Sequence, residues 1–162
     1  MIGPKTAFTL VELLISLTII AILMGTLIPT LGNFGKKQSV IQAVENFKSE
    51  LETVQSKSVS GITVSGFFVR WALKMDCSVA GGAKSYSLGY YNGGNFVSSR
   101  TETLGANLSI ACTAGDIIFE RITGKVTGLG AGQTRSFVFS STDITGFSKT
   151  AVLGERGQVT IQ

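Results

Sequence analysis

The sequence predicts an α+β protein in which a long N-terminal helix, with a transmembrane half and an amphipathic half, packs on an antiparallel β-sheet or a two-sheet β domain. Three observations support this fold class. No charged residue falls between Leu13 and Gly35. Apolar residues then recur at spacings of three and four, which is typical of a helix with one buried face. After Gly61, short runs of β-branched and aromatic residues alternate with clusters of Gly, Asn and Ser.

The first element is the apolar segment over residues 8–35. A helix needs roughly 20 apolar residues to span a bilayer, and this segment meets that length. Lys5 precedes it, which predicts a cytoplasmic N-terminus with the rest of the chain outside. Glu12 is the single charge between Lys5 and Lys36, and a carboxylate inside a membrane segment costs about 2.5–3.5 kcal/mol. Pro29 interrupts the segment and predicts a kink or local unwinding there.

Two other interpretations of this segment stay open. A cleavable signal peptide requires small residues in an A-x-A-like pattern after the apolar core, and residues 25–30 contain no convincing site of this kind. A plain signal anchor explains the length of the segment but gives no reason for Glu12.

The helix is predicted to continue over residues 36–61 as an amphipathic segment. Its apolar positions form a single stripe, which we expect to pack on a sheet: Val40, Val44, Phe47, Leu51 and Val54. Gly61 is predicted to be the C-cap.

Residues 62–162 are predicted to be all-β. Residues 91–95, Tyr-Asn-Gly-Gly-Asn, are typical of a hairpin turn, and residues 154–157 are predicted to be another turn. Residues 124–132 are Gly-rich and are expected to be a flexible loop. The predicted strands cover residues 62–64, 67–71, 85–91, 95–98, 116–122, 135–141, 151–153 and 158–161.

The sequence around the start of the apolar segment, Ala7-Phe8-Thr9-Leu10-Val11-Glu12, resembles the N-terminal signal of type IV pilins and type II secretion pseudopilins. The resemblance implies that a prepilin peptidase cuts between Ala7 and Phe8 and methylates the new amine of Phe8. Gly is usual before the cut, so Ala7 departs from the family pattern. The implied segments are a leader (1–7), a transmembrane and assembly helix (8–35), its amphipathic continuation (36–61) and an extracytoplasmic β domain (62–162).

The same resemblance implies a role for Glu12. In the family's helical filaments the apolar segments bundle at the centre, where Glu12 of one subunit would face the amine of Phe8 on a neighbour. Pairing lowers the cost of a buried charge, so the pair would favour extraction from the inner membrane into the filament. The implied partners are other pilin subunits, the prepilin peptidase, the inner-membrane assembly platform and the lipid bilayer.

Two segments of the β domain carry a second resemblance, to minor pseudopilins of the GspH/FimT type. These are residues 118–126, Ile-Phe-Glu-Arg-Ile-Thr-Gly-Lys-Val, and the closing residues 151–161. The family often has Pro two residues after the Phe, and Arg121 stands at that position here.

The side-chain inventory predicts no enzyme, no cofactor and no metal site. The chain has no histidine, and its acids show no paired spacing. Cys77 and Cys112 both fall in the predicted extracytoplasmic domain, so they are either bridged, at a gain of about 2–4 kcal/mol, or two buried free thiols.

The predicted function is that of a minor pilin or pseudopilin, which initiates, caps or decorates a type IV pilus or a type II secretion pseudopilus. A DNA-binding minor pilin of natural competence is one alternative, because the chain has a net charge of +4. A monomeric membrane-anchored ectodomain is another. The basic residues that could contact DNA, or could equally be scattered solvated charges, are Lys125, Arg135, Lys149 and Arg156.

Overall fold

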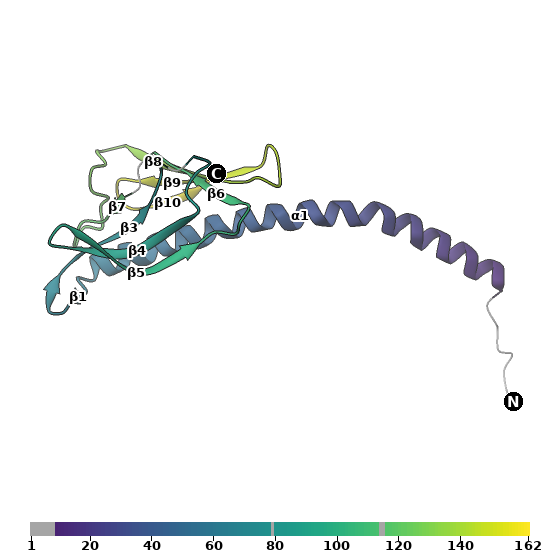
Figure 1. The fold of residues 1–162 in the computed structure, drawn as a ribbon, viewed down its shortest axis with the longest axis horizontal. Helices are drawn as coiled ribbons and strands as arrows, with labels where there is room; N and C mark the ends of the chain where they lie inside the picture. Colours follow the sequence, from purple (N-terminus) through teal and green to yellow (C-terminus); the bar gives the residue numbers. More distant parts are fainter. Residues whose placement is uncertain (1–8, 79, 114–115) are drawn as a thin grey trace, which may run out of the picture. The chain divides into compact units, whose positions relative to one another are not determined.

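A computed structural model of the chain describes residues 9–78, 80–113 and 116–162, with the backbone alone for residues 26–31. The chain forms two compact units, one ending at Gly35 and one beginning at Lys36. Helix α1 (Leu10–Val59) contributes to both units (Figure 1). It is continuous at Pro29, and the kink predicted there stays a prediction.

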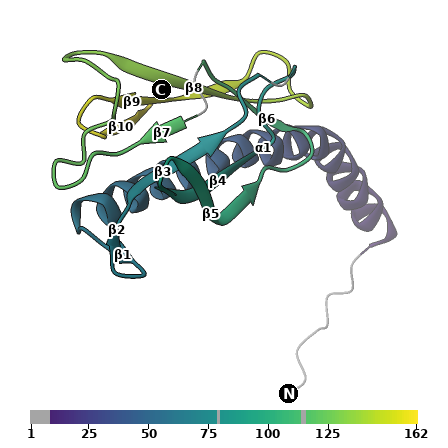
Figure 2. The same ribbon diagram turned by 60° about the vertical axis from the view of Figure 1, so that its left-hand side comes forward.

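Two four-stranded antiparallel sheets form the second unit together with the C-terminal part of α1 (Figure 2). This confirms the α+β class in its two-sheet form. One sheet has the strand order β5 (Asn95–Thr103), β4 (Ser85–Asn92), β3 (Arg70–Met75) and β7 (Asp116–Ile118). The other has the order β10 (Val159–Ile161), β9 (Ser148–Gly154), β8 (Thr134–Ser141) and β6 (Leu108–Ala111). A separate ribbon pairs β1 (Thr63–Val64) with β2 (Phe67–Phe68).

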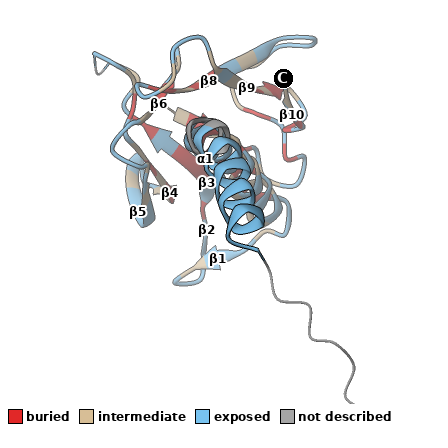
Figure 3. Ribbon diagram, turned by 90° about the vertical axis from the view of Figure 1, so that its right-hand side faces the viewer, coloured by how far each residue is buried: buried red, intermediate tan, exposed pale blue. Residues whose placement is uncertain are grey.

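The core lies between the helix and the inner faces of the two sheets. The predicted stripe is confirmed, because each of its five residues is at most 1% exposed. Phe47 is at its centre: its ring centroid lies 5.3 Å from that of Tyr86 in β4, 5.2 Å from Phe137 in β8 and 5.3 Å from Phe139 in β8. A single helical side chain therefore packs against both sheets. In Figure 3 the buried residues concentrate on the strands around this part of the helix.

The predicted turns are present. Gly93 and Gly94 join β4 to β5, with Asn92 paired to Asn95, and residues 155–158 join β9 to β10. Gly61 ends α1 with φ +64°, and the Ile62 N–H donates to the Lys57 carbonyl at 3.4 Å, which is the hydrogen-bond pattern of a Schellman cap.

Several strand predictions are wrong in extent. The run predicted over 67–71 is interrupted at Val69 and continues as β3 to Met75, and the run predicted over 151–153 covers Ser148–Gly154. The strand predicted over 116–122 ends at Ile118, because Glu120 and Gly124 close a turn in which the Glu120 N–H donates to the Lys125 carbonyl at 2.7 Å. Phe119 then pairs with Val126 on the returning chain. Strand β5 continues to Thr103 rather than ending at Ser98, and β6 was not predicted.

Candidate assembly and anchoring sites

Thr9 and Glu12 form the first turn of α1. The Glu12 N–H donates to Thr9 Oγ1 at 3.2 Å, and the Leu13 N–H donates to the Thr9 carbonyl at 3.2 Å. Thr9 is therefore the N-cap and Glu12 stands at the third helical position, which is the spacing of a capping box. A carboxylate in this turn also interacts favourably with the positive end of the helix dipole. The Thr-x-x-Glu pattern is visible in the sequence, so this second role of Glu12 could have been predicted.

Glu12 forms no ion pair with any cation among the described residues. Ala7 and Phe8, the predicted cleavage residues, lie outside the described residues, as does the leader 1–7. The pairing of Glu12 with the Phe8 amine of a neighbour therefore stays a prediction.

Large apolar side chains cover every side of the helix from Leu10 to Met24. They are between 47% and 76% exposed, and consecutive positions such as Leu13, Leu14 and Ile15 belong to the set. The hydroxyls of this segment are satisfied within the helix: Ser16 donates to the Glu12 carbonyl and Thr18 to the Leu14 carbonyl, each at 2.8 Å. An apolar surface of this extent is typical of an interaction site. The set comprises Leu10, Val11, Leu13, Leu14, Ile15, Leu17, Ile19, Ile20, Ile22, Leu23 and Met24.

No helical segment among the described residues combines the length and the hydropathy that a membrane crossing requires.

The C-terminal end of α1 is anchored by two polar side chains. Gln55 Nε2 donates to the Gly124 carbonyl at 3.1 Å and to the Arg156 carbonyl at 2.7 Å. Ser58, which is 1% exposed, donates to the carbonyls of Phe119 and Glu120 at 3.1 and 3.2 Å. These acceptors belong to the two segments that carry the second family resemblance, so those segments hold the end of the helix.

Glycine is required where these segments meet the helix. A Cβ on Gly157, whose φ is +80°, would overlap the Gln55 side-chain amide. A Cβ on Gly124, whose φ is +66°, would stand 2.8 Å from Val59 Cγ2. Both positions need a left-handed backbone and an absent side chain.

Of the four basic residues considered for DNA contact, three lie near the Gly154 end of β9 and one near its Ser148 end. Lys125 pairs with Glu155 at 2.9 Å, and this bond holds the pKa of the Glu155 carboxyl below its usual range. Arg135 donates to the Asp116 carbonyl at 2.6 Å. Lys149 is the second residue of β9, opposite Phe139, whereas Arg156 follows the other end of that strand. Lys125 and Arg135 are thus bonded within the domain, and Lys149 and Arg156 lie near opposite ends of β9.

Comparison with known proteins gives the following matches. Residues 4–28 match the family described as the prokaryotic N-terminal methylation motif. The type IV minor pilin FimU of Pseudomonas aeruginosa, in two crystal forms, superposes with TM-scores of 0.60 and 0.55 at 16% and 15% identity. These matches cover 80% and 75% of this chain and 92% and 90% of FimU.

The minor pseudopilin EpsH of the Vibrio cholerae type 2 secretion system superposes with a TM-score of 0.56 at 10% identity, covering 76% of this chain and 96% of EpsH. No protein of curated function matches the chain by sequence. The chain has a pilin fold. Together with the N-terminal motif, this confirms the predicted resemblance to type IV pilins and type II secretion pseudopilins.

Within this pilin fold, Cys77 and Cys112 form a disulfide, with their Cα atoms 5.4 Å apart. Cys77 follows β3 and Cys112 follows β6, so the bond links the two sheets. Of the two possibilities for these cysteines, the structure therefore shows the disulfide and not two free thiols.

A polar groove of about 400 Å³ runs between α1 and the end of β5. Arg100 crosses it, pairing with Glu50 at 3.2 Å and with Glu102. Burial of Tyr86, helped by these two carboxylates, raises its pKa to about 12. Among the described residues of the pilin fold, no three metal-binding side chains come together.

Proposed function

We propose that this chain is a minor pilin or pseudopilin, a structural subunit that initiates, caps or decorates a type IV pilus or a type II secretion pseudopilus. The observation that carries the proposal is the methylation motif over residues 4–28, joined to a pilin fold. The chain acts mechanically rather than as an enzyme.

The exposed apolar segment supports this role. Burial of apolar surface contributes about 25 cal/mol per Å², so side chains that are half exposed in the single chain gain most by packing against other copies or against lipid. Before assembly, residues 8–35 would reside in the bacterial inner membrane, with the N-terminus inside and the β domain outside. The prepilin peptidase would release residues 1–7, and the assembly platform would move the mature subunit into the filament.

Glu12 would direct this transfer by pairing with the methylated amine of Phe8 on an adjoining subunit. In a low-dielectric filament core the unpaired carboxylate is costly, whereas the paired one is much less so. The acid therefore favours the filament over the membrane.

The decisive experiment compares Glu12→Leu with Glu52→Leu, which removes another exposed and unpaired helical acid. We expect Glu12→Leu to leave membrane insertion intact and to lower the filament-bound fraction by about tenfold or more, the effect of about 1.4 kcal/mol. Immunoblots of sheared filaments and of membranes measure both fractions. Normal incorporation of Glu12→Leu contradicts the pairing, and a mature N-terminus other than a methylated Phe8 in mass spectra contradicts the assignment itself.

A further inference from the structure

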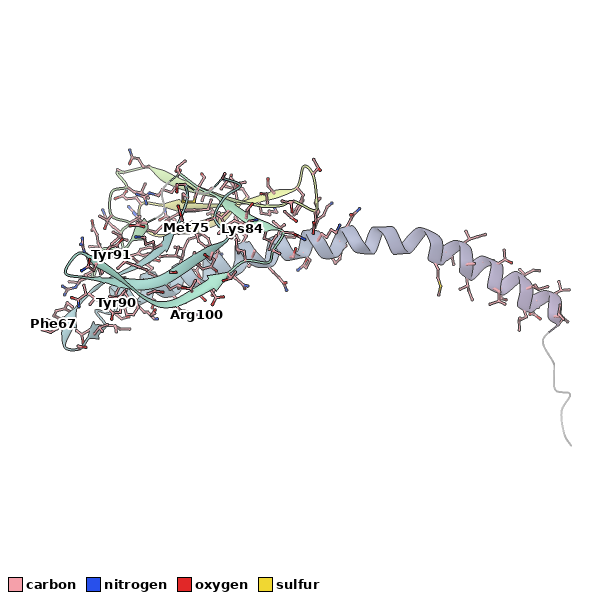
Figure 4. The ribbon with its side chains drawn as sticks, viewed as in Figure 1. Phe67, Met75, Lys84, Tyr90, Tyr91 and Arg100 are labelled. Atoms are coloured by element: carbon pink, nitrogen blue, oxygen red, sulfur yellow. A yellow bond between two sulfur atoms is a disulfide. The ribbon has the colours of Figure 1, made fainter. Side chains whose placement is uncertain are left out.

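The end of the second unit where α1 terminates carries an apolar surface that the proposed function does not use. We call it the tip patch. Phe67 and Phe68 of β2 are 71% and 62% exposed, and Figure 4 shows Phe67 projecting from the end of the domain. Ile122, on the turn after β7, is 76% exposed. Val59 and Ile62, at the end of the helix, complete the patch at 47% and 44%.

These side chains form one surface. The Arg121 guanidinium stacks 4.0 Å from the centroid of the Phe68 ring, which places the turn of Ile122 beside the β1–β2 ribbon. Ser58 donates to the carbonyls of Phe119 and Glu120, which places the same turn beside the end of the helix. Arg121 replaces the Pro that is frequent in the family, so this contact depends on a feature particular to this chain.

Ile122 has φ +69°, a region in which a β-branched residue is an outlier. Such a conformation is strained for a β-branched residue, and Asn or Gly would adopt it more easily. Hydrogen bonds within the turn hold this backbone, among them Glu120 N–H to the Lys125 carbonyl at 2.7 Å and Gly124 N–H to the Glu120 carbonyl at 3.0 Å. The conformation leaves the Ile122 side chain 76% exposed, as part of the tip patch.

The charged side chains around the tip patch indicate the chemistry of a partner that would fit it. Three cations near the patch form no ion pair with a described carboxylate. Lys57 lies over the Trp71 ring at 4.7 Å, Arg121 lies over the Phe68 ring, and Arg70 begins β3 two residues after Phe68. Glu120 is the acid on the same turn, and it accepts a hydrogen bond from Thr123 Oγ1 at 3.1 Å. Arg121 Nε is also buried without a hydrogen-bond partner in the described structure. An apolar surface rimmed by unpaired cations complements an apolar segment that carries carboxylates.

The backbone of the ribbon offers a second means of recognition. Strands β1 and β2 pair with each other and with no other described strand, so each presents an open edge. An isolated two-stranded ribbon is marginally stable, and an extended segment added at an edge would stabilise it with main-chain hydrogen bonds.

We propose that the tip patch is a docking site for an extended segment of a partner protein in which apolar and acidic residues alternate. The segment would pair with an edge of the β1–β2 ribbon, lay its apolar side chains on Phe67, Phe68 and Ile122, and direct its carboxylates to Arg121, Arg70 and Lys57. The proposal does not depend on filament assembly, since docking is a property of the single chain.

The test uses the full chain in detergent micelles, titrated with a short synthetic peptide of alternating valine and glutamate and followed by amide NMR shifts. We expect the shifts to concentrate at residues 59–70 and 120–124. A matched peptide with lysine in place of glutamate should cause none there. An absence of shifts, or shifts centred elsewhere, overturns the proposal, as does stronger binding of anionic vesicles or single-stranded DNA than of the acidic peptide.

A variant separates docking from a purely structural role of Ile122. Ile122→Asn should raise the melting temperature by about 2–4 °C, because the backbone strain is relieved, and should weaken peptide binding by about tenfold. The matched control is Val97→Thr, at a 39% exposed position of β5, which should leave binding unchanged. A fall in melting temperature with unchanged peptide affinity for Ile122→Asn shows that the residue serves the fold and overturns the proposal.

Discussion

One helix passes through two different environments in this molecule. Between Leu10 and Met24 its large apolar side chains are exposed on all sides, by 47% or more. Between Val40 and Val54 the apolar stripe is at most 1% exposed, while exposed positions such as Gln42, Glu45 and Glu52 lie off the stripe. The stripe from Val40 to Val54 is buried within the chain itself, because two sheets cover it. The apolar side chains between Leu10 and Met24 have no such cover within the described part of the chain, and under the proposed function lipid or other subunits would supply it. The exposure of apolar residues thus separates the part of the helix that packs within the second unit from the part whose apolar surface stays exposed.

Among the variants that test this comparison, Phe47→Ala should have the largest effect on stability. We expect the free energy of unfolding to fall by about 3–5 kcal/mol, because a fully buried ring in contact with both sheets is lost. The control, Leu17→Ala, removes a side chain that is 55% exposed and should change the value by less than about 0.5 kcal/mol. Urea unfolding of the full chain in micelles, followed by the fluorescence of the single tryptophan, Trp71, measures both. Equal losses would abolish the distinction between the two parts of the helix.

Removing the link between the sheets should have the next largest effect. The double variant Cys77→Ser, Cys112→Ser should lose about 2–4 kcal/mol, because the bond closes a sequence separation of 35 residues. A reductant should lower the unfolding midpoint of the natural chain by a similar amount and leave the double variant unaffected. A natural chain insensitive to reductant would show that the sheets hold together without this bond.

Gly157→Ala tests how the end of the helix is held. The backbone at φ +80° and the overlap with the Gln55 amide together should cost about 1–3 kcal/mol. Gly146→Ala is a matched control, since φ there is +79° and no atom lies within 4 Å of the added Cβ, so it measures the conformational cost alone. The excess at Gly157 should fall when Gln55→Ala is added, and the part due to the 3.0 Å approach to the Gly124 carbonyl should remain. An equal cost at both glycines would rule out a contribution from the Gln55 contact.

Alkaline pH should give the smallest effect and act on the second unit, which contains all three tyrosines. The pKa values of Tyr86 and Tyr91 are both about 12, raised first by burial and, for Tyr91, also by the hydrogen bond to Asp116. The folded pKa exceeds the ordinary value of 10, so this stabilisation is present below about pH 10 and is lost as the pH rises towards 12. In Tyr86→Phe the free energy of unfolding should fall less steeply with pH over that range. An unchanged slope would contradict the raised pKa of Tyr86.

The sequence predicts most strongly where one physical pattern dominates. The stripe from Val40 to Val54 was correct at every residue, because helical periodicity and burial coincide there. Strand β5 was predicted too short, because its polar residues from Ser98 to Thr103 lie at a sheet edge and carry no burial signal. The turn at Glu120 was missed, because Ile122 adopts a left-handed backbone that its β-branched side chain disfavours.

The candidate sites could be predicted where their residues lie close together in the sequence. Residues 4–28 carry a motif that is complete in the sequence, and the Thr-x-x-Glu spacing at Thr9 and Glu12 already indicates the N-cap. The engagement of Lys125 by Glu155 and of Arg135 by the Asp116 carbonyl depends on the topology of the two sheets, which no local pattern gives. The tip patch was missed for the same reason, since it unites residues 59–68 with Ile122.

The position of Phe47 has a mechanical consequence. Because this one ring touches a strand of each sheet, a pulling force on the helix of the second unit reaches both sheets at the same point. Displacement of this ring would therefore disturb the packing of both sheets at once.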